Sequence, residues 1–118
     1  MHSNNIIFAA FILILTLVAT ARAVTWDPSF CSWEGSLPLC NSDCPGRLGN
    51  ELRCTTEKKS CFNGHKGLCC PSKKQAICCQ VMNGLRSSWY DTYKEFDPDK
   101  AKEFYAECEA MRNSDQRH

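Results

Sequence analysis

The distribution of apolar and polar residues divides the chain into three parts. Residues 6–19 are uncharged and almost wholly apolar, residues 24–86 show short fragments of alternation between closely spaced turn formers, and residues 87–112 show helical spacing. Alternation of period two indicates strands, whereas apolar residues three and four positions apart indicate an amphipathic helix. We therefore expect a leader, a loop-rich module with short strands, and a helical C-terminal part.

The first apolar segment is typical of a secretory signal peptide. A small-x-small pattern follows it, and cleavage after Ala23 gives a mature chain that begins at Val24. The segment falls short of the roughly 18 apolar residues that a membrane-spanning helix needs. We therefore predict that residues 1–23 are a signal peptide, that the protein is secreted and extracellular, and that it has no stable membrane anchor.

All ten cysteines lie after residue 23. An even number of cysteines at this density in a short exported chain is typical of a disulfide scaffold. The predicted fold class is a small disulfide-rich domain of short β-strands and loops, stapled by up to five disulfides, with one or two C-terminal α-helices. The disulfide-forming residues are predicted to be Cys31, Cys40, Cys44, Cys54, Cys61, Cys69, Cys70, Cys78, Cys79 and Cys108.

Turn formers recur every few positions in the cysteine-rich region, and the segments between them are too short for a useful helix. Asn63-Gly64 is the best candidate for a hairpin turn. We expect residues 24–86 to form a cysteine-rich module and residues 87–118 a helical extension docked through Cys108.

The sequence Asp97-Pro98-Asp99 is typical of a helix start, with Asp97 as the capping residue. The apolar residues that follow it fall at spacings of three and four, which predicts a helix from Pro98 to Arg112. A shorter helix is predicted from about Ser87 to Phe96. The stripe of the longer helix consists of Ala101, Phe104, Tyr105, Cys108 and Met111.

Six of the ten aromatic rings beyond residue 23 lie between Trp89 and Tyr105. We interpret them as the apolar core that the loop-rich module cannot supply by itself. The alternative is an exposed aromatic platform for a sugar or a partner protein, with Trp89 and Tyr93 as binding residues. That alternative requires at least three of the rings to lie in solvent.

Charge is unevenly distributed along the chain. After loss of Arg22 the mature chain is formally neutral, which disfavours a nucleic-acid partner. Residues 44–86 nevertheless hold eight basic and two acidic side chains, with acidic segments on either side. We expect the flanks to neutralise this middle part; the alternative is a cationic face for an anionic partner, and Lys66 is one of its candidate binding residues.

Catalytic and metal-binding residues are scarce. His65 and His118 are the histidines of the mature chain, and disulfide-bonded cysteines have no thiolate, so we predict neither an enzyme nor a cofactor. Cys40-x3-Cys44 and Cys61-x3-His65 approach the ligand spacing of a zinc site. Five disulfides explain all ten cysteines, whereas a zinc site would explain three.

The segment Pro71–Ile77 lies between two pairs of adjacent cysteines. A loop pinned at both ends loses little entropy on binding, which is the property that protease inhibitors use. Lys73 or Lys74 would then enter a pocket specific for basic residues. We favour the simpler interpretation of these lysines as part of a solvated connector.

Two segments, CSWEGSLPLCNSDCP at residues 31–45 and CFNGHKGLCC at residues 61–70, resemble small secreted cysteine-rich proteins of fungi and nematodes. Those proteins carry C-x-W-x-G-S/T-x-P-x-C-x3-C and C-W/F-x-G-x-K-x2-C-C segments. The resemblance implies a secreted disulfide module, and it brings no established activity with it.

The resemblance also implies how the cysteines pair. If the six cysteines of the matching segments form three disulfides, then Cys54, Cys78, Cys79 and Cys108 form the other two. Adjacent cysteines bridge each other only with strain. We therefore expect Cys54 to pair with one of Cys78 and Cys79, and Cys108 to pair with the other.

These observations predict a secreted, monomeric, non-catalytic protein of the binding, effector or defence type, whose partner is an extracellular protein or a glycan. Two alternatives stay open. One is a serine protease inhibitor that uses the loop Pro71–Ile77. The other is a membrane-active or antimicrobial peptide that uses the basic middle segment.

Overall fold

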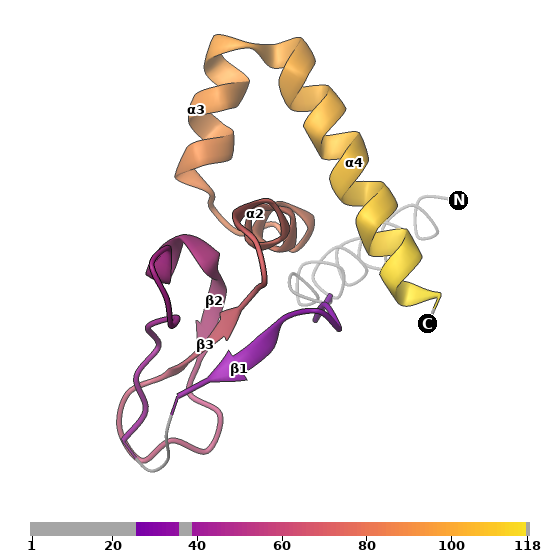
Figure 1. Ribbon diagram of the computed structural model, residues 1–118. Coiled ribbons are helices and arrows are strands. Elements are labelled where there is room, and N and C mark those ends of the chain that lie inside the picture. Colours follow the sequence, from indigo (N-terminus) through magenta and orange to yellow (C-terminus); the bar gives the residue numbers. More distant parts are fainter. Residues whose placement is uncertain (1–25, 36–38, 118) are drawn as a thin grey trace, which may run out of the picture.

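A computed structural model describes residues 26–35 and 39–117, so the predicted signal peptide lies outside the described residues. Three short strands form one antiparallel sheet, and three α-helices follow them along the chain. Helix α2 (Lys73–Met82) lies between the sheet and a hairpin of two helices, α3 (Ser88–Phe96) and α4 (Pro98–Gln116) (Figure 1). The predicted fold class is confirmed.

The sheet has β3 (Lys66–Cys69) at its centre, with β1 (Ser32–Glu34) on one side and β2 (Arg53–Glu57) on the other. Both outer strands run antiparallel to β3. Leu68 of β3 pairs directly with Trp33 of β1, so the two side chains lie on the same face of the sheet. Leu68 is buried and belongs to the core between the sheet and α2.

The core is built mainly from cystines. In its central cluster the buried side chains are small, apart from Leu68, because disulfides occupy the space that large apolar residues fill in larger domains. The central cluster consists of Cys54, Leu68, Cys70, Ala76 and Cys79, with Cys31, Trp33 and Leu85 packed against it.

Five disulfides use all ten cysteines, and the pairing implied by the resemblance is confirmed. Cys54 bonds to Cys79, and Cys78 bonds to Cys108, so the two adjacent cysteines of α2 join different elements. The six cysteines of the two matching segments form three bonds among themselves. These are Cys31–Cys70, Cys40–Cys61 and Cys44–Cys69.

The segment between the two cysteine pairs is a helix, and the prediction of a loop at Pro71–Ile77 is wrong. Helix α2 begins at Lys73, after Ser72, whose hydroxyl oxygen accepts a hydrogen bond from the backbone N–H of Gln75 at 3.2 Å. The Ser72 hydroxyl also donates to the Gln75 side chain at 2.9 Å. A serine cap with Gln three residues later starts the helix, and burial of Ala76–Cys79 holds it in place.

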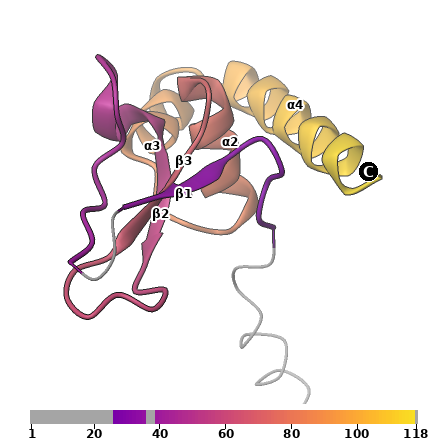
Figure 2. The ribbon, with the colours of Figure 1, turned by 60° about the horizontal axis from the view of Figure 1, so that its bottom comes forward.

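The two C-terminal helices occur where the sequence predicted them. Asp97 caps α4 by accepting from the backbone N–H of Lys100 at 3.3 Å, and Pro98 occupies the first turn. Helix α4 extends to Gln116, about one turn beyond the predicted end. Its last turn is held because Asp115 accepts hydrogen bonds from the segment before β1, which lies beside the end of α4 in Figures 1 and 2.

The connection between β2 and β3 is a hairpin, although its tight turn is not at Asn63-Gly64 as predicted. The backbone N–H of Cys61 donates to the carbonyl of Lys58 at 2.8 Å, so the chain reverses within the intervening two residues. Both of those, Lys59 and Ser60, have positive φ, as in the turns that fit β-hairpins. Asn63 instead pairs with Leu39 in an isolated bridge.

Candidate binding cleft

The aromatic rings of α3 and α4 do not form the core. No residue of α3 is buried, and the side chains of Trp89, Phe96 and Tyr105 are 38%, 81% and 40% exposed. The prediction that these rings supply the core is wrong, because the cystines between the sheet and α2 already fill the interior. The condition for the alternative, at least three rings exposed to solvent, is met.

A cleft of about 680 Å³ lies between α3, α2 and the short 3₁₀ turn η1 (Gly49–Leu52). Its volume falls within the range of roughly 300–1,000 Å³ that is typical of ligand-binding pockets. Trp89, Tyr93 and Phe96 lie four and three positions apart, so they project from one face of α3 and line the cleft together. Ile77 of α2 adds a further apolar side chain to the lining.

The rings are packed against one another. Trp89 stacks on Tyr93 with a centroid distance of 5.0 Å and an interplanar angle of 9°. On α4, Phe104 lies 5.2 Å from Trp89 and is tilted by 56°. We call Trp89, Tyr93 and Phe96 the aromatic wall of the cleft. Trp89 is exposed, but ring contacts from its own helix and from α4 hold its ring in a defined position.

Tyr90 lies on a different face of α3 and contacts α4. Its ring lies 6.1 Å from Phe104 and 6.5 Å from Tyr105, measured between centroids. Partial burial raises the pKa of the Tyr90 phenol, and the neighbouring Tyr105 and Asp91 raise it further. This contact joins α3 to α4, and Phe104, which Tyr90 contacts, also contacts Trp89 of the aromatic wall.

Charged groups stand around the aromatic wall. Lys73 lies 3.8 Å from Glu51 of η1, and Lys74 lies 2.7 Å from Glu107 of α4. Lys73, Lys74, Trp89 and Glu107 also line a second hollow of about 350 Å³ on the α4 side. Trp89 and Lys73 thus line both hollows, whereas Lys74 lines only the second.

No known family, curated protein or solved structure matches this chain. The assignment of the site therefore depends on its geometry. Four of the five residues proposed from the sequence as partner-binding lie together at this cleft and the adjoining hollow: Lys73, Lys74, Trp89 and Tyr93. The fifth, Lys66, is in β3 and lines neither of them.

Sequence reasoning missed three contributors to the cleft. Ile77 lies in a segment for which the sequence predicts a loop, and Arg86 has no sequence signal that distinguishes it from a solvated surface charge. Phe96 was visible in the helical spacing of α3 but was assigned to the core. The serine cap of α2 was the signal that could have revealed Ile77.

The position of the two lysines contradicts the premise of the protease-inhibitor alternative. Lys73 and Lys74 occupy the first turn of α2, in helical conformation. A protease binds the segment that it recognises as an extended strand, which a helical turn does not offer. Helix formation at this point removes the constrained loop on which that alternative depended.

The basic middle segment is partly neutralised by its flanks, as expected. Asp43 lies 3.9 Å from the guanidinium of Arg53, and Glu107 pairs with Lys74. Lys59 lies 3.6 Å from Glu57 and stands over the ring of Trp33 at 4.5 Å.

Among the described residues, no helix has both the length and the apolar character needed to span a bilayer.

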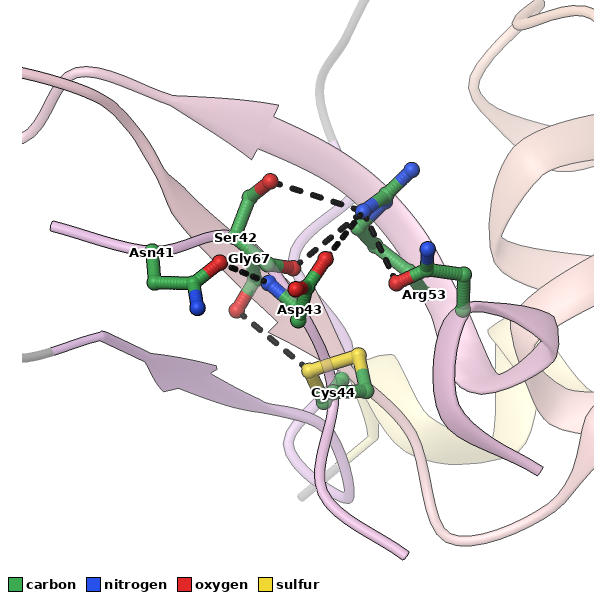
Figure 3. Close-up of polar contacts among 8 residues, drawn as sticks. Asn41, Ser42, Asp43, Cys44, Arg53 and Gly67 are labelled. Carbon is green, nitrogen blue, oxygen red and sulfur yellow. Dashed lines mark hydrogen bonds and ion pairs between the residues drawn. A yellow bond between two sulfur atoms is a disulfide. The ribbon is translucent and has the colours of Figure 1, made fainter. Parts of the chain in front are cut away.

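Arg53 is a structural residue (Figure 3). Its guanidinium donates to the backbone carbonyl and hydroxyl of Ser42 at 3.3 and 3.4 Å and to the Asn50 side chain at 3.0 Å. With Asp43 also close, these contacts hold the loop before Cys44 against the sheet. Because Nη1 of its guanidinium makes all of these contacts inside the molecule, we assign Arg53 a structural role rather than a place in the binding site.

The zinc alternative is excluded by the disulfides. Cys40, Cys44 and Cys61, which would have been its thiolate ligands, are all in disulfide bonds. Within residues 26–35 and 39–117, no group of three or more histidine, cysteine or acidic side chains is arranged to hold a metal ion.

Proposed function

We propose that this protein is a secreted, non-catalytic binding module that recognises a protein partner through the cleft between η1, α2 and α3. The observation that carries the proposal is an ordered aromatic wall that the fold leaves in solvent. Exposed aromatic clusters mark binding sites, and tryptophan and tyrosine dominate the energetics of protein interfaces. Five disulfides are typical of proteins that work in an oxidising, extracellular environment.

The arrangement of the rings favours a protein over a glycan. A sugar stacks on the free face of an aromatic ring, whereas Trp89 has Tyr93 against one face and Phe104 close by on the α4 side. Trp89 therefore has little free ring face for a sugar, and the space beside Ile77 suits an inserted apolar side chain. A scaffold held by disulfides loses little conformational entropy when it binds.

The test compares three forms of the mature, oxidised protein in pull-downs from its own extracellular fluid. These are the unchanged protein, the double variant W89A/Y93A, and the control variant Phe62→Ala. Phe62 is 82% exposed but lies in the β2–β3 connection and does not line the cleft. We expect proteins that are retained by the unchanged protein and by Phe62→Ala, and lost with the double variant.

Equal retention by all three forms would contradict the proposal. Far-UV circular dichroism tests whether the double variant is folded, which we expect because neither substituted residue is buried. A glycan array probed with the same three proteins separates the two partner classes. Retention of a glycan that depends on Trp89 and Tyr93 would reject the protein partner in favour of a sugar.

A further inference from the structure

Arg86 gives the cleft an uncompensated positive charge. Among the described residues, three charged side chains line the cleft, and two of them, Lys73 and Glu51, lie 3.8 Å apart and offset each other. Arg86 takes part in no ion pair with any of the described residues. The lining therefore has one excess positive charge, carried by the residue type best suited to binding a carboxylate.

The backbone at Arg86 is fixed relative to the aromatic wall. Arg86 directly precedes Ser87, the buried capping residue of α3, whose hydroxyl accepts from the backbone N–H of Tyr90 at 3.3 Å. Trp89 lies in the first turn that this cap organises. The guanidinium and the aromatic wall thus border one cleft and start from one ordered segment.

We infer that the segment bound in the cleft presents an apolar side chain next to a carboxylate, and that Arg86 selects the carboxylate. This inference rests on the proposed function and names the chemistry of its partner. The planar guanidinium pairs with a carboxylate through two parallel hydrogen bonds, while the apolar neighbour packs against Tyr93 and Ile77. A lysine-rich segment would bring like charges against Arg86 and Lys73.

A second copy of the chain is the competing occupant. The exposed Phe96, at the end of α3, stands between Glu95 and Asp97 and so has the same chemistry as the inferred ligand. Phe96 already forms part of the wall in its own molecule. An external acidic partner is the inference, and self-association is one of the outcomes that the experiment separates.

The experiment selects from a phage-displayed library of random linear peptides on the mature, oxidised protein. We expect the enriched peptides to carry an aromatic or aliphatic residue beside Asp or Glu. Synthetic copies of these peptides should bind Arg86→Gln at least about tenfold more weakly than the unchanged protein, because a charge-assisted hydrogen bond is lost. Arg86→Lys keeps the charge without the planar guanidinium, so its affinity for the peptides should lie between those of the unchanged protein and Arg86→Gln.

Arg47→Gln is the matched control. Arg47 is exposed and lies outside the lining of the cleft, so its loss should leave peptide affinity unchanged. Binding of the acidic peptides should also weaken with added salt, in parallel for the unchanged protein and for Arg47→Gln.

The outcomes distinguish this inference from the proposed function. Enriched peptides that lack acidic residues, or that bind Arg86→Gln and the unchanged protein equally, would overturn the inference and leave a cleft that binds peptides by apolar contact alone. Peptides that bind W89A/Y93A undiminished would overturn the proposed function as well. If sedimentation shows that the unchanged protein is a dimer and that Arg86→Gln is a monomer, the cleft binds a second copy of the chain.

Discussion

The indole N–H of Trp26 donates to the carboxylate of Asp115 at 2.9 Å and so joins the first and last described parts of the chain. The backbone N–H of Ser29 donates to the same carboxylate oxygen at 3.2 Å, and its hydroxyl donates to the other oxygen. The side-chain amide of Asn83 accepts a hydrogen bond from the backbone N–H of Trp26 at 2.8 Å and donates one to the backbone carbonyl of Trp26 at 2.7 Å. The buried Trp26 therefore connects the end of α2 with the end of α4.

Asp115→Ala should destabilise the protein by about 1–3 kcal/mol, because it leaves the buried indole N–H without its acceptor. Asp115→Asn keeps an acceptor oxygen and should recover part of the loss. Urea unfolding followed by tryptophan fluorescence measures both. The control is Glu109→Ala, an exposed substitution in the same helix, which should change the unfolding midpoint little; an equal loss in that variant would argue against a specific role for Asp115.

The sequence was sufficient to predict α3 and α4, because both helices have a strong local signal. Each begins with a capping residue, Ser87 or Asp97, and α3 has apolar residues at regular spacings of three and four. The resemblance also implies how the cysteines divide into two sets, although it leaves open which of Cys78 and Cys79 pairs with Cys54. These features depend on residues close together in the chain or on a spacing that the resemblance had already defined.

Helix α2 escaped prediction because its buried residues, Ala76–Cys79, are consecutive and produce no helical periodicity. The sequence does not predict the cleft either, for a different reason. A stripe such as Trp89, Tyr93 and Phe96 shows that three rings share a helix face, but the same stripe fits a buried face and an exposed one. The outcome depends on how much of the interior the cystines fill, which is a property of the tertiary structure.

Gly64→Ala should destabilise the protein far more than Gly46→Ala. Both glycines have positive φ, at +79° and +93°, so an alanine at either position costs about 1–2 kcal/mol in backbone conformation. A Cβ on Gly64 would also lie 2.2 Å from the carbonyl oxygen of Cys40, whereas a Cβ on Gly46 would meet nothing within 4 Å. Thermal unfolding of the two variants measures the difference, and equal melting temperatures would show that the clash is relieved at no cost.

The raised pKa of Tyr90 predicts a loss of stability in alkaline solution. A group whose pKa is higher in the folded state binds its proton more tightly there, so its contribution is complete below the pKa of the unfolded state. That contribution is lost as pH rises from about 10, the ordinary value for tyrosine, through the folded-state pKa. Tyr90→Phe should flatten this part of the profile of unfolding free energy against pH. Tyr93→Phe, which retains Tyr90, should keep it; an unchanged profile in Tyr90→Phe would refute the assignment.

The Cys78–Cys108 disulfide is the main covalent tie between α4 and the rest of the domain. Helix α4 has only two buried residues, Ala101 and Cys108, so little apolar packing remains when the bond is removed. Replacing both cysteines by alanine should lower the free energy of unfolding by about 2–4 kcal/mol, as expected for a disulfide that closes a loop of this size. Guanidinium unfolding followed by near-UV circular dichroism measures that loss.

Hydrogen exchange separates this local role from a general loss of stability. With Cys78 and Cys108 replaced, the amides of α4 should exchange faster than those of the sheet, because the helix opens by itself. The matched control replaces Cys40 and Cys61, whose disulfide includes no residue of a helix. That control should lose stability without selective exposure of α4. Faster exchange of α4 to the same extent in both variants would show that the helix unfolds only with the whole domain, and that Cys78–Cys108 does not hold it individually.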